Sequence, residues 1–409
     1  MLSALVQSQA AIVAIVITLT LIAVQLTASA YSPRVIDIFK KNPDMWILLS
    51  CYGASIFYGF IVLKLVVGAE GEFVSQSVIW TLGFISISFE SYVSITYWLG
   101  AFSFVALFPY MLNTIDLLKP PNIIKRLSDE ITRDKLLKYI EFAKTSKGVE
   151  TRTVDDPVQP IVDIIRGSLM RYDLETTRDG LKEIAEQAIK IIDSDEDMEI
   201  SRHFCDHLTR VGRLAISRED EESTIEVIEN LGDFAKSTAE KELAFATAGA
   251  ARSLGEVGKA AAEKGLAFAT EEAAESLREV GRAAAKNNLK YATERAAESL
   301  EEVGRTAAGK GLEGATRRVV ESLVEIGKAA AAKKGLEGAT ERAAESLAEL
   351  AILNREIAIN TAIKNYKSTS VRQDRDSFQK FMKKYEKELK KKKIMGQMNR
   401  GDLLRIKAR

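Results

Sequence analysis

Two histidines lie close together in this chain, and their spacing places them on one face of a helix. His203 and His207 are four residues apart, whereas Cys205 between them points elsewhere on a helical surface. Imidazole nitrogens bind transition metals, but two ligands do not complete a zinc site. His207 also occupies the serine position of a repeat described below. We therefore favour an ordinary repeat helix over a metal site or a pH sensor, and we expect no cofactor.

Two acidic segments have residue types that bind cations, but their patterns are incomplete. Residues 193–199 begin like a calcium loop, yet Met198 and Phe204 stand where such a loop has glycine and glutamate. This segment and residues 219–222 are predicted to be solvated loops. The sequence shows no phosphate-binding glycine motif and no plausible catalytic triad, so we do not expect an enzyme.

The acidic residues that are the strongest candidates for a functional role lie in the apolar first third of the chain. Glu90 interrupts an apolar stretch over residues 73–118, and Glu70 and Glu72 form an acidic loop before it. An ionisable residue at membrane depth is a functional candidate by default. Because rings of carboxylates concentrate cations at a pore, these three residues are pore candidates. The alternative is that Glu90 caps an interfacial helix in bulk water.

Three apolar stretches are long enough to cross a bilayer as helices. They cover about residues 9–31, 45–67 and 98–118, and a helix of this length crosses a hydrocarbon core of roughly 30 Å. Within the first stretch, Thr18 and Gln25 either line a pathway or hydrogen-bond to a neighbouring helix.

Charged loops predict how these spans are oriented. Basic residues lie after the first and third spans, and the positive-inside rule makes both segments cytoplasmic. They are Arg34, Lys40 and Lys41, and then Lys119, Lys125 and Arg126. This requires an odd number of crossings, so residues 73–89 are predicted to form a short re-entrant or interfacial segment. We expect a multi-pass protein of the cell membrane with its N-terminus outside and its C-terminal domain cytoplasmic.

The region around the first span resembles a known family. Gln25-Leu26 leads into Ser32-Pro33-Arg34, and the second span and residues 101–118 fit the same pattern. Over residues 1–125 the chain resembles an uncharacterised prokaryotic family of predicted membrane proteins. The resemblance implies a bacterial or archaeal membrane protein and supplies no activity. The sequence lacks the family's extra N-terminal span, and its repeats are unlike the family's usual C-terminal region.

The rest of the chain is polar, helical and repetitive. Residues 121–200 are predicted to form a helical linker domain, and residues 201–365 a 23-residue repeat. The repeat is marked by Leu208, Leu231, Leu254, Leu277, Leu300, Leu323 and, one residue later than the period, Leu347. Small and apolar residues at steps of three and four predict one helix per repeat, ended by a left-handed residue. The alternative is a bend at each Val-Gly pair that divides every repeat into two short helices.

Residues 366–409 form a basic C-terminal helix or tail. The segment 380–409 holds 12 basic and 3 acidic side chains, and Phe378, Phe381 and Tyr385 add an apolar edge. Such a tail is suited to anionic lipid, and the candidates for that contact are Lys390, Lys391, Lys392 and Lys393. The alternative is a solvated terminal helix that frays.

These features predict an all-α protein with a three-span transmembrane domain over residues 1–120, followed by a HEAT-like helical solenoid. The leading functional hypothesis is a homo-oligomeric channel or channel-like pore that passes cations, with cytoplasmic repeats for assembly or gating. The alternative is a membrane-anchored scaffold whose solenoid binds a partner protein without transport. The expected partners are the lipid bilayer, further copies of the chain and inorganic cations, but no nucleic acid.

Overall fold

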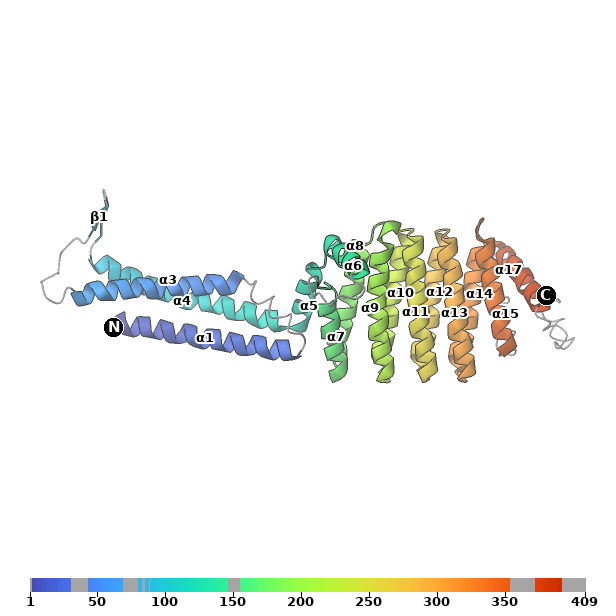
Figure 1. The fold of residues 1–409 in the computed structure, drawn as a ribbon, viewed down its shortest axis with the longest axis horizontal. Coiled ribbons are helices and arrows are strands. Elements are labelled where there is room, and N and C mark those ends of the chain that lie inside the picture. The colour runs from blue at the N-terminus through green and yellow to red at the C-terminus, as the bar shows by residue number, and fades with distance from the viewer. Residues whose placement is uncertain are drawn as a thin grey trace. The chain divides into compact units, whose positions relative to one another are not determined.

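The chain folds into two units that consist almost entirely of helices. A computed structural model describes residues 2–30, 43–68, 80–82, 85–87, 89–145, 155–353 and 372–391. The units are Met1–Arg126 and Leu127–Arg409, and Figure 1 shows the elements of each. The predicted all-helical class, with apolar helices first and helical repeats after them, is confirmed.

Unit 1 contains three long apolar helices. They are α1 (Leu2–Ala30), α3 (Pro43–Gly68) and α4 (Phe89–Leu118). Each is long and apolar enough to cross a membrane, over Leu2–Thr27, Pro43–Leu65 and Ser91–Leu118. The short helix α5 (Pro120–Asp129) follows them. The described part of the chain thus contains three candidate membrane spans, and the orientation that the charged loops predict stays a prediction.

The third of these helices begins earlier than the span predicted at residues 98–118. Helix α4 starts at Phe89, because the residues from Ser91 to Tyr97 include no glycine or proline to interrupt it. Glu90 consequently lies in the first turn of α4 rather than in a loop before it. The described part of the segment 73–89 is a hairpin of two antiparallel strands, β1 (Trp80–Leu82) and β2 (Ile85–Ile87).

Polar side chains join the three helices of unit 1. The Ser55 hydroxyl of α3 donates a hydrogen bond to the Gln9 side-chain oxygen of α1 at 3.1 Å. The Thr20 and Tyr110 hydroxyls of α1 and α4 lie 3.1 Å apart. Such bonds hold membrane helices together where lipid offers no hydrophobic driving force.

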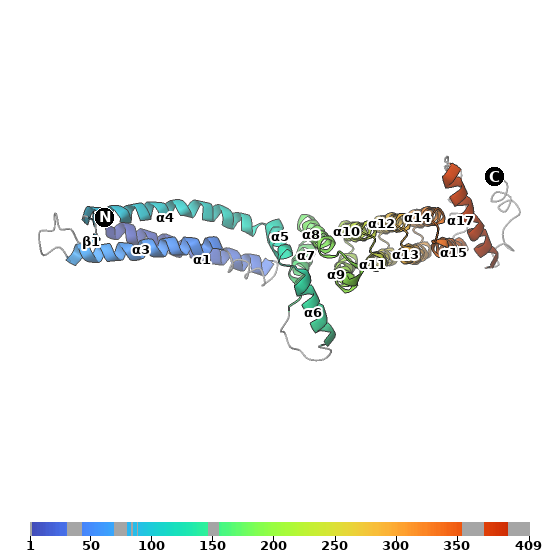
Figure 2. The ribbon, with the colours of Figure 1, turned by 90° about the horizontal axis from the view of Figure 1, so that it is seen from above.

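Unit 2 is an array of antiparallel helices in two rows. Its helices are α6 (Arg133–Thr145), α7 (Gln159–Arg171), α8 (Leu174–Ile191), the short 3-10 helix η1 (Asp195–Asp197), α9 (Met198–Ser217), α10 (Glu221–Glu240), α11 (Ala244–Lys264), α12 (Ala267–Lys286), α13 (Lys290–Gly309), α14 (Glu313–Ala331), α15 (Glu337–Leu353) and α17 (Arg372–Lys391). Figure 2 shows α8, α10, α12 and α14 in one row and α9, α11, α13 and α15 in the other. We call these the even and the odd row.

Each 23-residue repeat is one helix, as the periodicity predicts. A leucine precedes the helix, and its carbonyl accepts a hydrogen bond from the threonine hydroxyl four residues later, as for Leu266 and Thr270 at 2.6 Å. The same pair opens α11, α13, α14 and α15. Left-handed residues separate successive helices, among them Gly265 (φ 82°) and Asn288 (φ 60°). The alternative of a bend at each Val-Gly pair is therefore wrong.

The glycine of the Val-Gly pair allows neighbouring helices to approach closely. A Cβ atom at Gly258 of α11 would lie 2.6 Å from the Cβ of Ala273 of α12. At Gly304 of α13 it would lie 2.7 Å from a methyl group of Val319 of α14. The stripe of small residues is thus a packing surface between helices, as its composition predicts.

Helix α17 packs against α14 and α15 and buries its apolar residues there. Phe381 and Tyr385 are almost fully buried, and Phe381 lies directly over Gly327 of α14. The interpretation of these two residues as a free apolar edge for a lipid surface is therefore wrong. They are spaced to pack on the array instead, since residues four apart share one helical face.

Candidate functional site

The residues predicted to line a pore are not brought together by the described structure. Glu70 and Glu72 lie outside the described residues, and Glu90 is placed only by the backbone of α4. Thr18 and Gln25 of α1 are exposed, and the Thr18 hydroxyl donates to the Ala14 carbonyl of its own helix at 2.7 Å. The pore residues therefore stay a prediction.

The four lysines predicted to contact lipid lie at the end of the described chain. Lys390 and Lys391 belong to the last turn of α17, and Lys392 and Lys393 lie outside the described residues. Their contact with lipid stays a prediction.

The two histidines meet a carboxylate that the sequence analysis did not select. The His203 Nε2 lies 3.1 Å from Asp156 Oδ1, and the His207 Nε2 lies 2.8 Å from Asp156 Oδ2. The two Nε2 atoms are 3.2 Å apart. His203 and His207 lie one turn apart on α9, whereas Asp156 comes from the connector before α7. No local pattern around Asp156 marks it, because its partners are 47 and 51 residues later in the chain.

Burial and hydrogen bonding set the ionisation of this cluster. Burial by itself would raise the pKa of Asp156, but the hydrogen bonds from His203 and His207 hold that pKa well below its usual range. Burial lowers the pKa of His207, and the neighbouring Asp156 opposes that shift. Burial also raises the pKa of Tyr139, whose ring lies 5.3 Å from the His203 ring. The cluster at neutral pH therefore combines an ionised carboxylate with a neutral His207.

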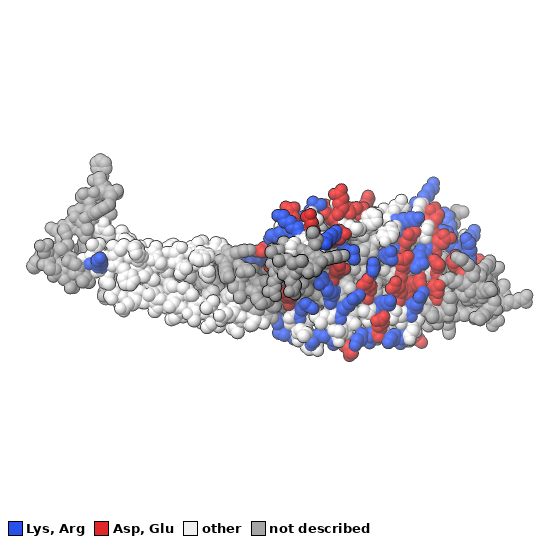
Figure 3. All heavy atoms as spheres, viewed as in Figure 1, with Lys and Arg blue, Asp and Glu red and all other residues white. Residues whose placement is uncertain are grey.

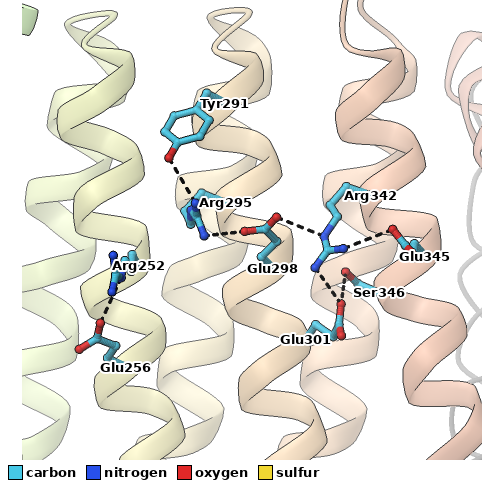
Figure 4. Close-up of polar contacts among 9 residues, drawn as sticks. All are labelled: Arg252, Glu256, Tyr291, Arg295, Glu298, Glu301, Arg342, Glu345 and Ser346. Carbon is cyan, nitrogen blue, oxygen red and sulfur yellow. Dashed lines mark hydrogen bonds and ion pairs between the residues drawn. The ribbon is translucent and has the colours of Figure 1, made fainter.

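The array carries nearly all the charged side chains that Figure 3 shows, whereas the described part of unit 1 is almost free of them. In the odd row these charges are matched across helices. Arg342 of α15 lies 3.5 Å from Glu298 and 3.3 Å from Glu301 of α13, and 3.2 Å from Glu345 of its own helix (Figure 4). Arg295 also pairs with Glu298, at 2.6 Å. Glu298, Glu301 and Glu345 of this row are thus compensated by guanidinium groups.

A groove between α10 and α12 in the even row is different, because the ionisable side chains that line it are all acidic. Its volume is about 180 Å³, and it is lined by Glu229, Gly232, Asp233, Glu272, Glu275, Ser276 and Glu279. Two of the carboxylates have partners, since Glu275 pairs with Arg278 and lies 3.6 Å from Arg318 of α14, and Glu279 lies 2.9 Å from Lys236. Within the described part of the chain, the other three carboxylates form no ion pair or hydrogen bond. We call this feature the acidic groove.

Partial burial and neighbouring carboxylates raise the pKa values of two unpaired carboxylates of the acidic groove. Partial burial, followed by repulsion from Glu226, Glu272 and Asp233, raises the pKa of Glu229. Partial burial, followed by repulsion from Glu275 and Glu279, raises the pKa of Glu272. Arg178 opposes the shift of Glu229 and Arg318 opposes that of Glu272, but both pKa values stay raised.

Comparison of the repeats shows how the acidic groove arises. Glu272 occupies the position that holds Arg295, Arg318 and Arg342 in the three later repeats. In those repeats the arginine pairs with the glutamate three residues later, at distances between 2.6 and 3.8 Å. In α12 the same position faces Glu275 with a like charge. The equivalent position holds His203, Glu226 and Gly249 in the earlier repeats, so α12 lacks the arginine that compensates this site in the three later repeats.

Comparison with known proteins finds a family model that is similar to the first part of the chain. Residues 1–193 match the model of a family described as predicted membrane protein (DUF2254). The match extends past the 125 residues that carry the resemblance and ends after α8, so it includes Asp156 but neither the histidines nor the acidic groove. It supports the assignment of this protein to the membrane.

The other comparisons add little. One similar solved structure is described as a circular tandem repeat protein with novel repeat topology and enhanced subunit contact surfaces. It is 17% identical, covers 89% of this chain and 84% of its own length, and superimposes with a TM-score of 0.34. No curated protein matches the chain.

Proposed function

We propose that this protein is a membrane-anchored scaffold whose helical array binds a basic segment of a partner protein in the acidic groove. The proposal rests chiefly on the three unpaired carboxylates of that groove, Glu229, Asp233 and Glu272. The helices of unit 1 supply the anchor. The proposed role involves no catalysis, and the basic loops favour a cytoplasmic position for the array.

Charge complementarity identifies the class of partner. A lysine or arginine side chain placed between α10 and α12 would relieve the repulsion that raises the pKa values of Glu229 and Glu272. Arginine is suited best, because its guanidinium forms two parallel hydrogen bonds with one carboxylate. Binding by such exposed charges weakens as salt is added. We therefore propose a lysine- and arginine-rich protein segment as the occupant.

The test uses the full-length protein in detergent and a fluorescent peptide rich in lysine and arginine. The Glu272→Arg variant restores the residue of the later repeats, and Glu263→Arg makes the same charge change at an exposed site on α11 outside the groove. We expect Glu272→Arg to weaken binding about tenfold, a change of about 1.4 kcal/mol. Glu263→Arg should change it less than twofold.

Two results would contradict the scaffold proposal. Equal losses for both variants would mean that the peptide responds to net charge alone. A cross-linking experiment that places the bound peptide away from α10 and α12 would show that the groove is not its site. An acidic peptide of the same length serves as the control for non-specific adsorption, and it should not bind.

The cation channel is the second candidate, and one observation favours it. Gln25 is exposed on α1 within a candidate span, where contact with lipid is costly and another subunit or water would satisfy it. Three spans per chain are too few to enclose a pathway, so several copies would have to surround one. Glu70, Glu72 and Glu90 are the proposed acidic residues at its outer mouth.

Flux measurements in liposomes test the channel directly. If Glu90 lines a pore, the reconstituted wild-type protein should pass cations. The Glu90→Gln variant should then pass them more slowly. Undisturbed flux in this variant would remove Glu90 from the mechanism. The absence of flux, or a purified protein that is monomeric, would exclude the pore itself and leave the scaffold.

A further inference from the structure

The convergence of three potential metal ligands at the start of the array points to a further site. Asp156, His203 and His207 place one carboxylate and two imidazole nitrogens within 4.8 Å of one another. The nearest approaches are 2.8, 3.1 and 3.2 Å. A tetrahedral ion at about 2.0–2.1 Å from each ligand would hold the ligand atoms about 3.3 Å apart. The cluster therefore needs shifts of a few tenths of an ångström to accept an ion.

Burial distinguishes this cluster from a chance meeting of surface groups. The side chains of His207, Asp156 and His203 are 1%, 10% and 13% exposed, so the protein fixes all three. The backbone N–H of Val158 donates to Asp156 Oδ1 at 2.9 Å and orients the carboxylate toward α9. His203 is the most exposed of the three side chains, so it is the ligand that solvent reaches most readily.

Hydrogen bonding among the three side chains leaves one buried nitrogen without a hydrogen-bond partner in the described part of the chain. A neutral imidazole carries one proton, and the buried Nδ1 of His207 has no partner within the described residues. Both Nε2 atoms are instead directed at the same carboxylate and at each other. A cation that displaces the two Nε2 protons would meet two imidazole lone pairs and a carboxylate that face one point.

We propose that Asp156, His203 and His207 bind one divalent transition-metal ion, such as Zn²⁺, through the carboxylate and the two Nε2 atoms. Imidazole ligands favour zinc, nickel, copper or iron over magnesium and calcium. Three protein ligands leave a fourth position for water. The bound ion would tie the connector before α7 to α9 and so stabilise the start of the array.

The test uses Co²⁺ as a spectroscopic probe on the full-length protein, purified in detergent without an affinity tag and stripped with a chelator. The expected result is one equivalent of Co²⁺ per chain with the intense visible absorption of a four- or five-coordinate site. Zn²⁺ should displace the Co²⁺, and an equal concentration of Mg²⁺ should not.

Variants separate this site from adventitious binding. Asp156→Asn keeps the shape of the side chain, and His203→Gln removes the less buried ring. Loss of either ligand should weaken Co²⁺ binding more than about 100-fold. This exceeds the loss expected when a residue that only supports a ligand is replaced. Tyr139→Phe is the matched control, because its ring lies beside His203 without being a ligand. Helical circular dichroism verifies that each variant is folded.

Three outcomes would overturn the metal site. They are the absence of visible cobalt bands, displacement by Mg²⁺, or equal affinity in the folded Asp156→Asn protein and the wild type. Failure of this test would leave the acidic groove untouched, because the groove lies between α10 and α12 and shares no residue with the cluster.

Discussion

Two glycines in one helix should respond in opposite directions to the same substitution. Gly258 and Gly249 both lie inside α11, where alanine is favoured over glycine by about 0.5–1 kcal/mol. A Cβ atom at Gly249 meets nothing within 4 Å. At Gly258 it would lie 2.6 Å from the Cβ of Ala273 and 3.1 Å from Val303, whereas ordinary contacts begin at 3.4 Å. The Ala273 Cβ cannot rotate away, so α11 and α12 would have to separate.

The expected magnitudes follow from these contacts. Overpacking costs typically 1–3 kcal/mol, which exceeds the gain in helix propensity, so Gly258→Ala should destabilise α11 by about 1–2 kcal/mol. Gly249→Ala should stabilise it by about 0.5–1 kcal/mol. Amide hydrogen exchange of α11 in the full-length protein measures both, with exchange about 5- to 30-fold faster in Gly258→Ala and a few-fold slower in Gly249→Ala. Equal protection in the two variants would refute the close approach of the helices.

Three further predictions concern charge and capping. Glu272→Gln should slow amide exchange of α12 at pH 7 but not at pH 4. Because the pKa of Glu272 is raised, its ionised form destabilises the folded state at pH 7, and this penalty is absent below the pKa of an unfolded glutamate, about 4.3. Phe381→Ala should expose α14 by removing the end cap, a local loss of about 3–5 kcal/mol, while repeats far from the end keep their protection. Arg133→Ala should destabilise the start of α9 and speed its amide exchange, because it leaves the buried Asp197 without its charged donor at 2.7 Å. Unchanged exchange in any of these segments would contradict the corresponding contact.

Local patterns in the sequence were sufficient for the helices but not for the sites. The leucine period and the small-residue stripe predict one helix per repeat, because both follow from the geometry of a single helix. Asp156 could not be found in this way, since it meets His203 only after the connector and α9 have packed. The sequence does not predict the burial of Phe381 and Tyr385, for a related reason. An apolar edge has the same spacing whether it faces lipid or protein, and only the packing on α14 decides between them.

The alternation of single helices between two rows constrains how the array can change in length. Each helix belongs to the row opposite its neighbour, and Arg213, Lys236 and Lys259 each reach a carboxylate 43 residues later, in the next helix of the same row. Loss or gain of one 23-residue copy would transfer every later helix to the opposite side and bring unrelated charges together. Duplication or deletion of two copies, 46 residues, would leave every later helix in its original row. A natural or engineered array of this kind should therefore vary by pairs of helices.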